Sequence, residues 1–206
     1  MSNIAESPYS EKEIPFDAFL RSDQLDNNNY LSIRKNILQV HEGKCLQEHG
    51  YIVKIGNITN PDDTKLSNVI PREHYDPVIP LSIRANCRMC LPIKQTLITA
   101  QVVSTNKMMI RAKNGPIDAI LTMDRINTKE FKNTGDIIRY KYINNEGQTK
   151  LKAITEDDYV KILIETVKYS DGKPNIIILA SLKGMSTDKE IAQFQKDELY
   201  LPNKMK

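Results

Sequence analysis

The residues best suited to chemistry are the three cysteines. Cys87 and Cys90 form a C-x-x-C motif, and two thiolates at this spacing can supply half of a tetrahedral zinc site. The candidates for the other half are Cys45, His41, His49 and His74. No second C-x-x-C is present, and two glycines interrupt the segment that would align the histidines. We expect the cysteines to be small apolar residues at a domain junction, with zinc bound by Cys87, Cys90 and Cys45 as the alternative.

Recognisable catalytic motifs are absent from the sequence. It holds no Walker A loop, no G-x-G-x-x-G after a strand, no G-x-S-x-G elbow and no H-E-x-x-H pair. With eight glycines in total, no phosphate-cradling loop can be assembled. The acidic run at residues 156–158 could suggest a divalent cation, but we expect a solvated loop. The sequence therefore predicts no cofactor and no enzymatic activity.

Basic residues at alternate strand positions indicate a site that binds without reacting. Arg111 and Lys113 should point away from Met108, Ile110 and Ala112, because successive strand residues face opposite sides. The same alternation separates basic from apolar positions in two later strands. The candidate RNA-binding residues are Lys107, Arg111, Lys113, Arg139, Lys141 and Lys161. The alternative is that these are ordinary lysines and arginines on the wet side of half-exposed strands.

Two tyrosines accompany this basic pattern. Tyr140 and Tyr142 share a strand face with Ile138. We therefore expect both rings to lie in the core and not to form a stacking platform for bases.

The apolar pattern predicts an α+β fold that begins with a flexible leader and a small tip domain. Residues 1–15 are polar, contain two prolines and are expected to form the leader. Residues 16–90 are expected to form the tip domain. It should contain a helix at Asn29 to His41 that buries Ile33, Ile37 and Val40. Strands are expected after Gly50, at residues 66–70 and from Val78.

Residues 91–185 show short alternating strands, which are typical of a five-stranded oligonucleotide-binding (OB) barrel. Strands are expected at residues 97–103, 108–113, 117–121, 137–143, 159–167 and 175–182, which is one more than the barrel requires. The surplus is explained if segments 137–143 and 148–154 form an inserted hairpin and the last two strands close the barrel. In the tail, residues 186–206, Thr187 and Glu190 have capping-box spacing and predict a short helix. Its apolar face could pack on the barrel or dock on a partner.

Charge and composition set the broad class. The net charge is +3, and the excess of Lys and Arg lies in residues 91–206. The longest apolar stretch, Ile176 to Ala180, is too short to span a bilayer, so no membrane association is expected. Three cysteines are too few for a disulfide framework, which favours a reducing, intracellular compartment. The polar N-terminal segment does not have the pattern of a signal peptide.

The order of these elements resembles the stalk subunit of multisubunit RNA polymerases, which is the seventh-largest subunit of RNA polymerase II and has an archaeal counterpart. The likeness lies in residues 36–58, 93–103, 114–117, 158–162 and 178–182, and it extends from about Phe16 to Gly184. Two departures are Pro92-Ile93-Lys94-Gln95, where that family usually has a Gly-Glu pair, and the tail after Gly184. The composition, rich in Asn, Ile and Lys, resembles the versions carried by large DNA viruses.

The resemblance implies a subunit without catalysis. Its tip domain would dock on the polymerase core, its barrel would contact nascent single-stranded RNA, and a small helical stalk subunit would be a further partner. A viral version would act in the host cytoplasm and be carried in the virion, whereas a cellular version would act in the nucleus. The alternatives are a free-standing OB-type RNA-binding factor in translation or RNA decay, and a metal-dependent enzyme using Cys87 and Cys90.

Overall fold

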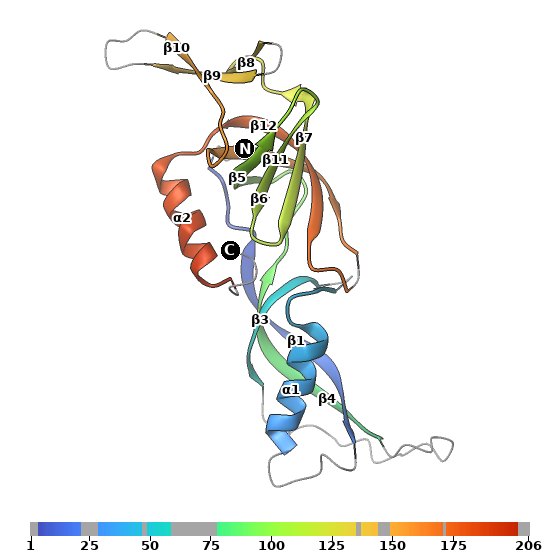
Figure 1. The fold of residues 1–206 in the computed structure, drawn as a ribbon. Helices are drawn as coiled ribbons and strands as arrows, with labels where there is room; N and C mark the ends of the chain where they lie inside the picture. Colours follow the sequence, from blue (N-terminus) through green and yellow to red (C-terminus); the bar gives the residue numbers. More distant parts are fainter. Residues whose placement is uncertain are drawn as a thin grey trace.

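The computed structural model describes residues 4–21, 29–46, 49–58, 78–134, 137–143, 149–170 and 172–201. An N-terminal sheet with one helix lies at one end, a closed barrel follows it, and a small inserted sheet projects from the far end of the barrel (Figure 1). The expected α+β class with a barrel is confirmed. Within the described residues, no helix is long and apolar enough to cross a membrane.

The N-terminal sheet has four strands in the order β1-β4-β3-β2. These are β1 (Tyr9–Arg21), β2 (Cys45–Leu46), β3 (Gly50–Ile58) and β4 (Val78–Cys90). Helix α1 (Asn29–His41) has the expected bounds and buries Ile33 and Ile37 against one face of the sheet. The prediction for Val40 is wrong, because its side chain is exposed. The strand expected at residues 66–70 lies outside the described residues.

The expectation of a flexible leader is wrong from Tyr9 onward. Strand β1 begins there and pairs residue by residue with β4, from Tyr9 opposite Cys90 to Arg21 opposite Val78. Pro15 is compatible with this strand because β1 is an edge strand, where a missing N–H need not break the ladder. Ile14 and Phe16 are buried and alternate with exposed polar residues, as in a strand. This alternation is short, so the polar composition of the segment led to the prediction of a flexible leader.

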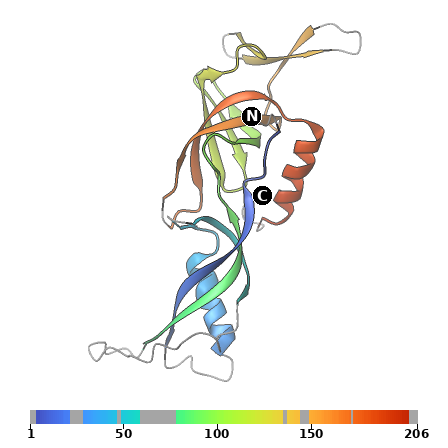
Figure 2. The ribbon, with the colours of Figure 1, turned by 180° about the vertical axis from the view of Figure 1, so that it is seen from behind.

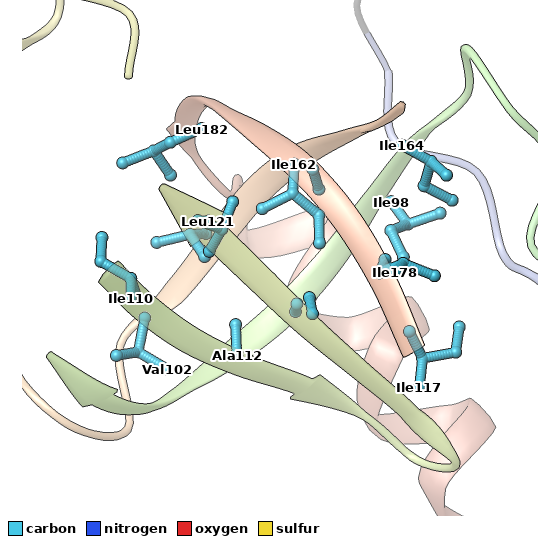
Figure 3. Close-up of a cluster of buried hydrophobic side chains, with 14 of the residues drawn as sticks. Ile98, Val102, Ile110, Ala112, Ile117, Leu121, Ile162, Ile164, Ile178 and Leu182 are labelled. Carbon is cyan, nitrogen blue, oxygen red and sulfur yellow. The ribbon is translucent and has the colours of Figure 1, made fainter. Parts of the chain in front are cut away.

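The barrel is closed by five strands in the order β11-β12-β7-β6-β5. These are β5 (Leu97–Thr105), β6 (Met109–Asn114), β7 (Ile117–Ile126), β11 (Tyr159–Lys168) and β12 (Ile176–Met185). β12 runs parallel to β7, and the other pairs are antiparallel. Inward side chains from every strand fill the interior, including Ile98, Ile110, Leu121, Ile162 and Ile178 (Figure 3).

The inserted sheet comprises β8 (Phe131–Thr134), β9 (Ile137–Ile143) and β10 (Thr149–Ala153). The predicted hairpin between residues 137–143 and 148–154 is confirmed as the β9–β10 pair, and β8 adds a strand on the other side of β9. In both ribbon views the sheet extends beyond the barrel end that is remote from α1 (Figure 2).

The predicted C-terminal helix is α2 (Asp188–Leu199). The Thr187 N–H donates to Glu190 Oε2 at 2.8 Å, as the capping-box spacing implied. Of the two alternatives left open, the helix packs on the barrel: Phe194 meets the ring of Tyr159 edge-on at 5.3 Å. Its buried face consists of Glu190, Phe194 and Asp197.

Candidate nucleic-acid interface

The outward side of β6, β7 and β12 combines basic and apolar side chains. Arg111 lies beside Ile120, which lies beside Leu179, because the three occupy one row across the strands. The next row contains Lys113, Asp118 and Ile177, and the Asp118 carboxylate accepts a hydrogen bond from Asn175 Nδ2 at 2.9 Å. Leu179 and Ile177 are 38% and 40% exposed. Such a surface can pair phosphates with the cations while sugars or bases lie on the aliphatic strip.

We call this surface the barrel face and define it by Arg111, Lys113, Ile120, Ile177 and Leu179. The outward orientation predicted for Arg111 and Lys113 is confirmed, since Ile110 and Ala112 between them are buried. Sequence reasoning missed the three aliphatic members. They belong to strands that are apolar at nearly every position. Such strands lack the apolar–polar alternation that would show which residues face outward.

A carboxylate at the margin of the barrel face is paired within the protein. Glu165 accepts a hydrogen bond from Ser181 Oγ and forms an ion pair with Arg125. Its negative charge is therefore largely balanced before any polyanion approaches.

Lys107 lies in the turn that joins β5 to β6, and its side chain is exposed. The Asn106 Oδ1 accepts the N–H of Met108 at 3.0 Å and that of Met109 at 2.8 Å, which fixes the turn. The prediction that Met108 faces the core is wrong: it is 79% exposed and precedes the strand. The turn is continuous with β6, so Lys107 lies at one end of the strand that carries Arg111.

The opposite end of the barrel is closed by the N-terminal sheet. The Gly172 N–H donates to the Cys45 carbonyl at 3.0 Å, and the Cys45 N–H donates to the Lys173 carbonyl at 2.9 Å. The turn between β11 and β12 therefore docks on β2.

Lys161 faces outward, as predicted, since Val160 and Ile162 are buried. It is nevertheless covered by α2: its side chain is 14% exposed, and Nζ lies 2.7 Å from Glu190 Oε1. Burial by itself would raise the pKa of Glu190, but hydrogen bonds from the Ala5 N–H, Lys161 and Thr187 outweigh burial and lower that pKa to about 2. Lys161 thus serves the packing of α2 and is not part of the barrel face.

Near Lys161, a groove of about 670 Å³ runs between the N-terminal segment and β12. Its charged lining residues are Glu6, Glu130, Lys161 and Lys183. The two carboxylates offset the two ammonium groups, so the groove lacks the uniformly positive lining that a phosphate backbone favours.

Arg139 and Lys141 lie on β9 of the inserted sheet and not on the barrel. Arg139 is half-buried, and the exposed Lys141 donates from Nζ to the Lys129 carbonyl at 2.9 Å. The prediction that Tyr142 is a core residue is wrong, since 40% of it is exposed. Tyr140 packs partly against the barrel core, as expected. The difference arises because β9 leaves the barrel as it runs from Ile138 toward Tyr142.

The geometry opposes the zinc alternative. Cys87 and Cys90 are three positions apart on β4, so their side chains leave opposite faces of the strand. Cys87 lies in the core under α1, whereas Cys90 lies with Cys45 in the core continuous with the barrel. Burial raises the pKa of Cys87 to about 11 and that of Cys90 well above its ordinary value, which disfavours the thiolates that bind metal.

The histidines within the described ranges add no metal site. His41 packs against the ring of Phe16 at 5.0 Å between ring centroids. Across the described ranges, no group of three or more His, Cys, Asp or Glu residues is placed to hold a metal ion. His74 lies outside those ranges.

The chain is similar in sequence to a viral protein. The chain is 28% identical over 156 residues to a protein of Acanthamoeba polyphaga mimivirus described as a "putative DNA-directed RNA polymerase subunit". The alignment covers 76% of this chain and 73% of the mimivirus protein. No protein-family model matches the chain.

Proposed function

We propose that this chain is a non-catalytic stalk subunit of the DNA-directed RNA polymerase of a large DNA virus. The observation that carries the proposal is the similarity to the mimivirus protein over about three quarters of both chains. The architecture supports the finer assignment, because an N-terminal α+β unit followed by an OB-type barrel is the order expected for a stalk subunit. Such a subunit would act with the polymerase in the host cytoplasm and be carried in the virion.

The N-terminal unit, residues 16–90, is the proposed docking part. Phe19 and Leu31 are exposed there, near the end of β1 and in the first turn of α1. The C-terminal end of β1 and the first turn of α1 lie at the end of the molecule remote from the barrel (Figure 1). Exposed large apolar side chains at such an extremity suit burial against another protein. The proposed partners are polymerase core subunits and a small helical stalk subunit.

Co-purification from infected cells tests the docking role. A tagged copy should recover the large polymerase subunits, and Phe19→Glu with Leu31→Glu should lower that recovery at least about tenfold, because carboxylates would have to be buried at the contact. The control is Arg111→Glu with Lys113→Glu, which adds charge away from the docking end and should leave recovery unchanged. A tagged protein that recovers no polymerase yet binds RNA tightly would instead support a free-standing RNA-binding factor.

The barrel face is the proposed contact for nascent single-stranded RNA. Arg111→Glu with Lys113→Glu should weaken binding of a fluorescent RNA of about 20 nucleotides by at least about tenfold at low salt and flatten the salt dependence. The matched control is Lys12→Glu with Lys54→Glu, which makes the same charge change at exposed positions of the N-terminal sheet. Equal affinities for the two double variants would contradict a role for the barrel face.

A further inference from the structure

The inserted sheet places exposed tyrosine and lysine side chains on one face. Lys150 is directly opposite Tyr142 and Lys152 is directly opposite Tyr140, so each pair projects from the same side of the sheet. The two rings are tilted by 51° with centroids 6.1 Å apart. Both lysines are exposed. We call these four residues the tyrosine–lysine face.

The rest of the sheet is also positively charged. Lys132 and Arg139 pair across β8 and β9, and with Lys141 they project from the opposite face of the sheet. In β8, β9 and β10, within the bounds given above, five of sixteen side chains are Lys or Arg and none is Asp or Glu. Phe131 and Ile138 anchor the sheet on the barrel core, and the sheet extends beyond the barrel in both ribbon views (Figures 1 and 2). Tyr142, Lys150 and Lys152 are exposed, so a polyanion could reach them without displacing another described element.

Packing explains one tyrosine but not the other. Tyr140 is partly buried against the barrel core, beside Phe131 across the strand pair. Tyr142 is two residues farther along β9 and is not among the residues packed on that core; its ring contacts that of Tyr140, and 40% of the residue is exposed. An exposed ring flanked by ammonium groups fits single-stranded nucleic acid, where a base stacks on the ring and phosphates meet the lysines.

We propose that the tyrosine–lysine face is a second RNA-binding site, separate from the barrel face. Tyr142 provides the ring on which a base stacks, and Lys150 and Lys152 hold the neighbouring phosphates. The inference rests on the proposed function, because it takes single-stranded RNA as the ligand. An acidic protein segment would engage the lysines but would leave the ring without a stacking partner, so RNA accounts for more of the face.

Anisotropy titrations of the full-length protein with a fluorescent oligouridine of about 20 nucleotides test the site. Tyr142→Ala should lower the affinity at least about fivefold through loss of stacking, and Tyr142→Phe should restore it to within about twofold of the unaltered protein. Lys150→Glu with Lys152→Glu should weaken binding and reduce its salt dependence. With 5-iodouridine in the probe, light should crosslink the RNA to the peptide that contains Tyr142.

The outcomes separate this inference from the proposed function. If Tyr142→Ala and the Lys150/Lys152 double variant bind as the unaltered protein does while the Arg111/Lys113 variant is weakened, the second site is wrong and the barrel face stands. If the unaltered protein binds no oligouridine, both proposed RNA-binding sites, the barrel face and the tyrosine–lysine face, are wrong. If the inserted-sheet variants keep RNA affinity but lose polymerase recovery, the face contacts protein and the inference is overturned.

Discussion

Single residues fix the junction between the N-terminal sheet and the barrel. Asn114 is buried: its Nδ2 donates to the Thr99 carbonyl at 2.7 Å, and its Oδ1 accepts the Tyr9 hydroxyl at 3.1 Å. One side chain thus joins β5, β6 and β1. Arg88 on β4 stacks on the ring of Tyr200 at 4.2 Å and pairs with Asp197 Oδ1 at 2.9 Å. These polar contacts fix the orientation of the N-terminal sheet relative to the barrel. Apolar packing alone would specify that orientation less precisely.

Gly115, in the turn after Asn114, should be sensitive to any side chain. Its φ is +55°, and an added Cβ would lie 2.2 Å from the Tyr9 hydroxyl oxygen. We expect Gly115→Ala to lower the free energy of unfolding by about 3 kcal/mol through backbone strain and overpacking. Gly172→Ala is the matched control, since φ is +69° with nothing within 4 Å, and should cost about 1 kcal/mol. Urea denaturation measures both, and equal costs would contradict the role given to the Tyr9 contact.

At the scale of elements, α2 holds the N-terminal segment against the barrel. Its buried Glu190 accepts the Ala5 N–H at 2.8 Å, and Asp197 accepts the Ser7 hydroxyl at 2.7 Å. The same two carboxylates pair with Lys161 of β11 and Arg88 of β4. The inner face of the helix therefore combines two charged residues with the apolar Phe194.

This arrangement predicts a pH dependence of stability. The pKa of Glu190 is lowered to about 2 in the folded protein, so its stabilising contribution is present above the unfolded pKa of about 4.3 and is lost as pH falls toward about 2. Glu190→Gln should therefore be less stable than the unaltered protein by about 2 kcal/mol near pH 7, and the difference should shrink below about pH 4. Denaturation at several pH values measures this. A difference that stays constant with pH would contradict the assignment.

The elements differ in how far sequence could predict them. Helix α1, the five barrel strands and the α2 capping box follow from local periodicity and spacing, which operate within a few residues. Strand β1 was missed because its partner is β4, far away in the chain. The covering of Lys161 by α2 and the exposure of Tyr142 likewise depend on where an element is placed. Local pattern gives the face of a strand but not what lies over that face.

At the scale of the whole molecule, the N-terminal sheet and the barrel share apolar packing. One core is confined to the N-terminal sheet and α1. The other contains the barrel interior together with Cys45, Tyr51, Val53 and Cys90 from the N-terminal strands. A chain that unfolded only its barrel would expose these four side chains to water.

We therefore expect thermal unfolding to be one cooperative transition, with coincident midpoints by far-ultraviolet circular dichroism, near-ultraviolet tyrosine dichroism and calorimetry. Fragment 1–90 alone should not fold stably, since its surface against the barrel would be uncovered. Two separated calorimetric transitions, or a folded fragment with dispersed amide resonances, would contradict this coupling.

The docking of the β11–β12 turn on β2 has a mechanical consequence. Together with the β4–β5 connection, it gives the barrel more than one attachment to the N-terminal sheet, so the barrel cannot swivel as it would on a single tether. A partner that binds the end carrying Phe19 and Leu31 would therefore also fix the orientation of Arg111 and Tyr142. The N-terminal sheet and the barrel should move as one rigid body. The angle at which the N-terminal sheet docks on a partner would then determine the direction in which the barrel points.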